Sequence, residues 1–128
     1  MKLLLDTHML LWAATDDSQL SRQARSVLLD RQNTLYLSVA SAWEIVIKYQ
    51  SGKLRLPDTP EPFLRRTLQE LVIESLPVTL EHALRVQILP NHHRDPFDRI
   101  LIAQAHSENL TILTNDPVFA NYPVRTLW

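Results

Sequence analysis

The stretch that decides the fold is Lys2-Leu3-Leu4-Leu5-Asp6, a short apolar run with a carboxylate directly behind it. An uninterrupted apolar run of this length fits a strand that is buried on both faces of a parallel sheet. In open α/β sheets, ligands bind beyond the carboxyl ends of the strands, which is where this strand would place Asp6. The stretch therefore predicts an α/β fold and the position of a site.

The rest of the chain alternates between strand and helix signals. We predict further strands at 34–37, 72–76 and 110–114, a fifth candidate at 124–127, and helices at 8–14, 21–31, 39–50, 63–71, 79–89 and 95–109. Ser38 is placed to cap the third helix, and Gly52 to supply the left-handed residue after its end. This alternation predicts a parallel sheet of four to five strands with helices on both faces.

The bulk composition limits the alternatives. A length of 128 residues predicts one domain spanning residues 1–128. Because cysteine is absent, a disulfide framework, a thiolate metal site and a catalytic thiol are excluded. Asp6 interrupts the first apolar run too early for a signal peptide, and no later run is long enough to span a bilayer. We therefore expect a soluble, unprocessed protein without a membrane partner, in keeping with a cytoplasmic location.

The charge balance does not by itself favour a nucleic-acid partner. The net charge is −1 and the pI is about 6.5, whereas domains that hold nucleic acid through a broad basic surface usually have a pI above about 9. Any such contact must be local, transient or assisted by metal ions that reverse the charge of an acidic site.

Four acids fall at places where a site is expected. Asp116 follows Thr114, the last residue of the fourth predicted strand, by two positions, as Asp6 follows the first strand. Glu44 shares a helix face with Ala40 and Ile47, and Asp98 shares one with Leu101, Ile102 and Ala105. An unpaired buried charge is costly, so each inward-facing acid needs a cation, strong hydrogen bonds or a proton.

Magnesium or manganese would meet that need, because both prefer hard oxygen ligands. A water held by such an ion can become a nucleophile, and two ions can stabilise both oxygens of an in-line phosphoryl displacement. We expect Asp6, Asp98 and Glu44 to bind the principal ion and Asp116 to complete the site or help to hold a second one.

Each acid also has an ordinary structural interpretation. Asp6 could cap the following helix, and Glu44 could form a surface pair with Lys48. Asp98 could be the third residue of a capping arrangement begun by Asp95, the interpretation that we favour for Asp95, and Asp116 could be a turn residue.

Histidines and basic residues are less informative. Adjacent histidines such as His92 and His93 rarely ligate one ion, and His8 is expected to be packed or hydrogen-bonded, although it could contact a phosphate. Four basic side chains are candidates to steer a polyanionic substrate, without a ranking among them: Arg94, Arg99, Lys48 and Lys53.

Four segments, taken in order, resemble one family: 3–8 with 10–12, Ser41-Ala42-Trp43-Glu44-Ile45 with Lys48, 93–99 leading into 101–105, and Leu113-Thr114-Asn115-Asp116. Over essentially its full length, the chain resembles a PIN domain of the kind found in VapC-type toxins of bacterial toxin–antitoxin systems. The resemblance implies a three-layer α/β/α fold and magnesium- or manganese-dependent hydrolysis of RNA by an endoribonuclease. It further implies neutralisation by a small antitoxin protein and a homodimer.

Carried over position by position, the resemblance assigns the acidic quartet to Asp6, Glu44, Asp98 and Asp116. It implies that Thr114 orients the acids, whereas Asp95 matches only part of the family, which leaves its catalytic role open.

Two rivals remain. A phosphatase of the haloacid dehalogenase type would need a second aspartate where His8 stands, which counts against it. A PIN-like module that binds RNA or a partner without cutting is the other alternative.

Overall fold

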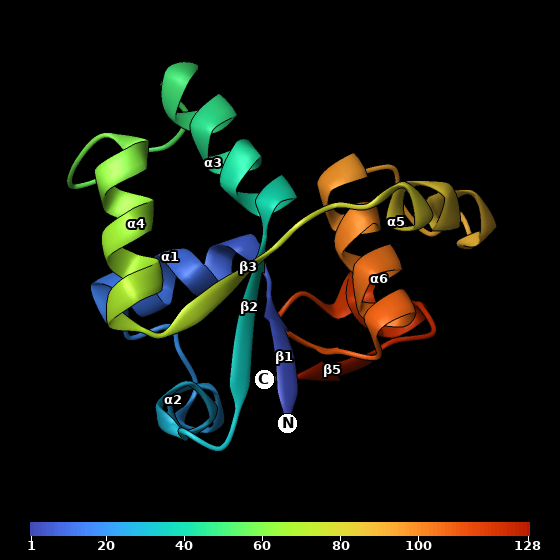
Figure 1. The fold of residues 1–128 in the computed structure, drawn as a ribbon, viewed down its shortest axis with the longest axis horizontal. Helices are drawn as coiled ribbons and strands as arrows, with labels where there is room; N and C mark the ends of the chain where they lie inside the picture. Colours follow the sequence, from blue (N-terminus) through green and yellow to red (C-terminus); the bar gives the residue numbers. More distant parts are fainter.

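A five-stranded, entirely parallel sheet forms the centre of the molecule, with the strand order β3-β2-β1-β4-β5 (Figure 1). The computed structural model describes all of residues 1–128. The strands are β1 (Lys2–Leu5), β2 (Thr34–Ser38), β3 (Ile73–Leu76), β4 (Thr111–Leu113) and β5 (Arg125–Leu127). The predicted parallel sheet is confirmed, including its fifth strand.

Six α-helices and two 3₁₀ helices connect the strands. They are α1 (Thr7–Thr15), α2 (Arg22–Leu29), α3 (Val39–Gln50), α4 (Pro60–Glu70), α5 (Leu80–Arg85), η1 (Val86–Ile88), α6 (Pro96–Glu108) and η2 (Pro117–Asn121). Helix α3 has the predicted bounds: the Ser38 side chain accepts a hydrogen bond from the Ala40 amide, and Gly52 follows the helix with a φ of 77°. None of these helices is long and apolar enough to cross a membrane.

Two helix boundaries differ from the prediction by three residues or more, for identifiable reasons. Helix α4 begins at Pro60 rather than Phe63, because proline suits the first helical position, where its missing N–H is not needed. The helix predicted to run to Leu89 changes to a 3₁₀ turn after Arg85, and Leu89 itself is extended. The residue before a proline is disfavoured in the helical region, so Pro90 ends the helix.

The sheet is covered on both faces, and alternate residues of β1 divide the core into two parts. Leu3 and Leu5 pack with one cluster, which includes residues of α1 to α4. Leu4 points to the other, which includes residues of α6 and η2. All three leucines are fully buried, and burial of each stabilises the fold by roughly 1.5–3 kcal/mol. The predicted three-layer α/β/α architecture is thus confirmed (Figure 1).

The topology places a site at the carboxyl ends of the central strands. The chain leaves β1 towards β2 on one side, whereas β4 pairs on the other side, so the strand order reverses next to β1. The Asp6 amide continues the pairing by donating to the Leu113 carbonyl at 3.1 Å. Helices α3 and α6 also contact each other beside this point. Ligands of open α/β sheets bind at such reversals.

Candidate acidic active site

A cavity of about 130 Å³ lies at the reversal point, and no hydrophobic residue lines it. Its lining contains all four acids of the predicted quartet and Asp95, together with Thr7, His8 and Lys48. Residues that are distant in the sequence are therefore gathered as predicted, although their catalytic roles stay predictions.

Asp6 is buried and held by Thr114. The Thr114 hydroxyl donates to Asp6 Oδ2 at 2.8 Å, and Thr114 Oγ1 accepts from the Asp116 amide at 3.1 Å. Asp6 occupies the N-cap position of α1, but its side chain makes no capping hydrogen bond, so the capping interpretation is wrong. Burial raises the pKa of Asp6, and the bond from Thr114 opposes that rise.

Glu44 is also buried, and both of its carboxylate oxygens have partners. Oε1 lies 2.8 Å from the Thr7 hydroxyl, which in turn lies 2.9 Å from the Ser41 hydroxyl. Oε2 accepts from Lys48 Nζ at 2.7 Å, and this hydrogen bond raises the pKa of Lys48. The pair with Lys48 exists, but it is not a surface pair, because only 8% of the Glu44 side chain is exposed.

The helix face predicted for Glu44 needs a correction. Ala40 is buried as expected, but Ile47 is 39% exposed. This face of α3 therefore borders the cavity and solvent rather than the hydrophobic core. Thr7 and Ser41 were not singled out by the sequence analysis. Both lie inside the quoted motifs, next to Asp6 and three residues before Glu44, and this proximity was the available signal.

Asp95 and Asp98 play different parts at the start of α6. Asp95 Oδ1 accepts from the Phe97 and Asp98 amides at 2.9 and 3.3 Å, which confirms Asp95 as a helix cap. The Asp98 side chain does not cap the helix but meets His93 Nε2 at 3.3 Å. Leu101 and Ile102, which follow on its face, are buried as predicted.

Asp98 has the most perturbed carboxyl group of the site. Burial and the charges of four neighbouring acids raise the pKa of Asp98 to about 8; in decreasing order these acids are Asp95, Asp6, Glu44 and Asp116. The cavity thus concentrates more negative charge than its lysine can balance.

Asp116 lies at the exposed rim. Its Oδ1 accepts a hydrogen bond from the Val118 amide at 3.0 Å and thereby caps the start of η2. This bond confirms the turn interpretation. Asp116 and Asp6 also line a more open hollow beside the first cavity, together with His8 and Trp12. The turn role leaves the second carboxylate oxygen, Oδ2, without a protein partner.

The predicted basic residues separate into two groups. Arg99 is bound to the loop before α6: its Nη1 donates to the Pro90 carbonyl at 2.9 Å and also reaches the Tyr122 hydroxyl at 3.3 Å. The structure therefore does not support Arg99 as a residue that steers RNA. Lys48 lines the cavity, whereas Arg94 and Lys53 lie outside its lining and their roles stay predictions.

The donor set of the cavity fits magnesium or manganese in its chemistry. Asp6 Oδ1, Asp98 Oδ1 and Asp116 Oδ2 have no hydrogen-bond partner in the protein, while the other oxygen of each carboxylate is held. No three acidic or histidine side chains converge closely enough to coordinate one ion as they stand. Magnesium commonly uses only one or two protein carboxylates and retains several waters, so a closed protein shell is not required.

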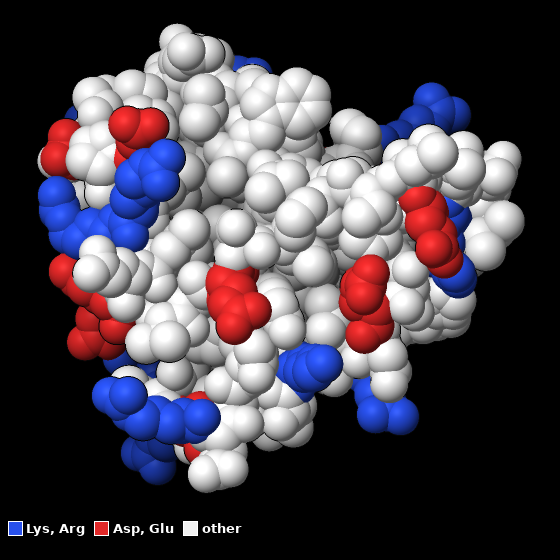
Figure 2. All heavy atoms as spheres, in the orientation of Figure 1, with Lys and Arg blue, Asp and Glu red and all other residues white.

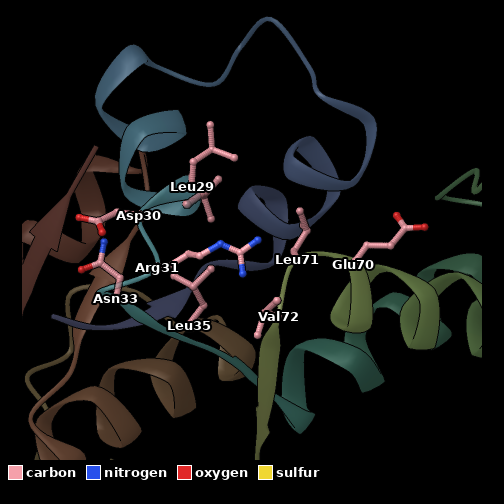
Figure 3. A pocket seen from close by; sticks show the side chains of 9 residues that line it. Leu29, Asp30, Arg31, Asn33, Leu35, Glu70, Leu71 and Val72 are labelled. Carbon is pink, nitrogen blue, oxygen red and sulfur yellow. The ribbon is translucent and has the colours of Figure 1, made fainter.

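A further hollow, of about 220 Å³, lies away from the acidic quartet, between the end of α2 and the turn from α4 into β3. Figure 3 shows Arg31 extending into it among apolar side chains that include Leu35 and Leu71. None of the predicted site residues lines this hollow. The candidate site is therefore the acidic cavity alone.

Comparison with known proteins gives one family that matches nearly the whole chain and one relative that matches about half of it. The PIN domain family matches residues 3–124. Ribonuclease VapC16 of Mycobacterium tuberculosis is 33% identical over 61 residues, which are 48% of this chain and 42% of that protein. The match thus spans less than half of that relative's length.

Solved structures agree in fold at low sequence identity. The complex of VapBC2 from Rickettsia felis with a DNA fragment from its promoter contains a chain with a TM-score of 0.75 and 18% identity, covering 99% of this chain and 98% of that one. FitAcB from Neisseria gonorrhoeae gives a TM-score of 0.65 at 19% identity, with coverage of 98% and 96%. VapBC-5 from Mycobacterium tuberculosis, described as a member of a toxin–antitoxin family, gives 0.59 at 20%, with coverage of 94% and 89%.

Proposed function

The chain belongs to the PIN domain family, and from that premise we propose that it is a metal-dependent endoribonuclease acting as the toxin of a toxin–antitoxin pair. One observation carries the proposal: the cavity at the sheet reversal gathers the acidic quartet and leaves three carboxylate oxygens without protein partners. The relative named as a ribonuclease supports the activity, and the similar chain from a family of toxin–antitoxin systems supports the toxin role.

In this proposal, Asp6, Asp98 and Asp116 would hold a magnesium or manganese ion through their free oxygens, one or two of them directly and the rest through waters that the ion retains. When bound, such an ion would lower the pKa of a coordinated water and offset charge on the phosphate. Thr114 fixes the direction of the Asp6 carboxylate through its hydroxyl. Both Glu44 oxygens already accept a hydrogen bond, and release of Oε2 by Lys48 would free Glu44 to join the ligands, so Glu44 and Lys48 are coupled.

Lys48 then has a second role. Once released from Glu44, its ammonium group lies at the wall of the cavity and can pair with a phosphate of the substrate. Such a local contact suits RNA binding by a chain without a strong basic excess. On the face seen in Figure 2, lysine and arginine side chains are scattered towards the margins and form no continuous basic surface.

The two rivals differ in what they predict. The family match leaves the phosphatase of the haloacid dehalogenase type without support. A PIN-like module that binds RNA without cutting predicts RNA binding in the absence of any cleavage.

RNA cleavage with and without a divalent ion tests the proposal. We expect cleavage of total RNA with Mn²⁺, none with EDTA, and at least a hundredfold loss in Asp6→Asn and Asp98→Asn. Glu74→Gln is the matched control, because Glu74 is an exposed acid on β3 outside the cavity. Full activity in either cavity variant, or loss of the same size in the control, would overturn the assignment. Mapping the cut ends would identify the RNA target.

A cognate antitoxin and a homodimer complete the proposal. Val39, Trp43 and Ile47 form an exposed apolar stripe on α3, and Trp43 lines an apolar groove with Phe97 and other residues. Figure 2 shows an uncharged area over α3 and between α3 and α5. A two-fold interface uses the same surface on both copies, so a continuous apolar surface of this kind can pair with itself.

Light scattering during gel filtration tests the homodimer. We expect a dimer for the unmodified chain and a monomer for Trp43→Glu. A monomeric unmodified chain would refute the homodimer, and a stable complex formed only when the antitoxin is coexpressed would assign this surface to the antitoxin.

A further inference from the structure

Three donors and acceptors meet at the Tyr122 hydroxyl, below the loop that precedes α6. The Tyr122 side chain is buried. Its oxygen accepts from the His93 backbone N–H at 3.2 Å and from Arg99 Nη1 at 3.3 Å. The third neighbour, at 2.6 Å, is His93 Nδ1.

These contacts determine how the hydroxyl proton is used. A phenol oxygen has one proton to donate and a limited capacity to accept, which the His93 amide and Arg99 already occupy. The short contact of 2.6 Å to His93 Nδ1 then offers an acceptor for the Tyr122 proton, and in this arrangement Nδ1 carries no proton of its own. A neutral imidazole with an unprotonated Nδ1 carries its proton on Nε2.

His93 Nε2 faces the acidic cavity. It lies 3.3 Å from Asp98 Oδ2, and no other side chain donates a hydrogen bond to the Asp98 carboxylate. We propose that Tyr122 and His93 form a relay that positions Asp98: Tyr122 fixes the tautomer of His93, and the Nε2–H of His93 holds Oδ2 so that Oδ1 points into the cavity.

The relay matters because Asp98 has little else to orient it. Four of its neighbours in the cavity are acids, which repel a carboxylate rather than hold it, and the lysine of the cavity, Lys48, is hydrogen-bonded to Glu44. Partners that orient a ligating group commonly alter metal affinity by roughly 10–100-fold when they are removed. His93 is thus a positioning residue, and this inference rests on the proposed function in requiring that Asp98 is a ligand.

The test compares three histidine variants by Mn²⁺ titration followed by electron paramagnetic resonance. His93→Leu removes the donor, and we expect at least tenfold weaker Mn²⁺ binding. His93→Gln should retain most of the affinity, since the glutamine Nε2 can replace the imidazole Nε2 as a donor. His92→Leu is the matched control: His92 also packs against the Tyr122 ring, with ring centroids 5.1 Å apart, but does not reach Asp98.

Unchanged Mn²⁺ affinity in His93→Leu, or an equal loss in His92→Leu, would overturn the positioning role. Failure of the unmodified protein to bind Mn²⁺ would instead refute the proposed ion site. The effect of Tyr122 on the His93 tautomer is then tested by ¹⁵N NMR of the imidazoles in the ion-free protein. We expect His93 to be protonated at Nε2 only, and to lose this preference in Tyr122→Phe; a proton on Nδ1 would refute the relay.

Discussion

Replacing Asp98 by asparagine should stabilise the ion-free protein while removing its proposed activity. The pKa of Asp98 is raised from 3.8 to about 8 by burial and by neighbouring acids. In the folded state the carboxyl group therefore keeps its proton at pH values where the unfolded chain has lost it. Since the unfolded state binds fewer protons, the free energy of unfolding falls as the pH rises from about 4 to 8.

The size of the effect follows from the shift. One pKa unit corresponds to about 1.4 kcal/mol, so the shift sets an upper limit of about 4 kcal/mol at pH 7. One fifth of the Asp98 side chain is exposed, so solvent screens part of this penalty. We expect Asp98→Asn to gain about 1–3 kcal/mol at pH 7 and little at pH 4.

Urea unfolding of both proteins in EDTA, at several pH values between 4 and 8, measures the difference. The stability of the unmodified protein should fall with pH more steeply than that of Asp98→Asn, while Glu74→Gln should follow the unmodified protein because Glu74 is exposed and outside the cavity. Parallel curves for the unmodified protein and Asp98→Asn, or a variant less stable at pH 7, would refute the argument that burial and repulsion strain this carboxylate.

Three further outcomes are expected. Excess Mn²⁺ at pH 7.5 should raise the melting temperature of the unmodified protein by several degrees and that of an Asp6→Asn/Asp98→Asn double variant by much less; equal shifts would place the ion elsewhere. Thr114→Val should lower the RNA cleavage rate about 10–100-fold by removing the hydroxyl that orients Asp6. Thr114→Ser keeps a hydroxyl and should cleave at nearly the unmodified rate, and a fully active valine variant would contradict the role of the hydroxyl. Leu4→Ala, at a fully buried position, should cost about 2–5 kcal/mol in urea unfolding, and a cost below 1 kcal/mol would contradict the described core.

Local signals in the sequence were sufficient for most of the fold. The apolar run before Asp6 marked β1, and Ser38 and Gly52 marked the ends of α3, because strand burial and helix capping depend on residues close together in the chain. Strand and helix alternation then required parallel pairing. The four acids were likewise located from their positions after strands and on helix faces.

Tertiary structure alone decided how those acids are held. The Thr114–Asp6 hydrogen bond joins residues 108 positions apart, and the Thr7–Glu44 bond joins residues 37 apart. The commitment of Arg99 to the loop carbonyls and the contact of His93 with Asp98 also depend on how α6, its preceding loop and Tyr122 pack together. Local pattern can place a carboxylate at the end of Leu3-Leu4-Leu5, but only the packed sheet determines which oxygen is held and which remains free.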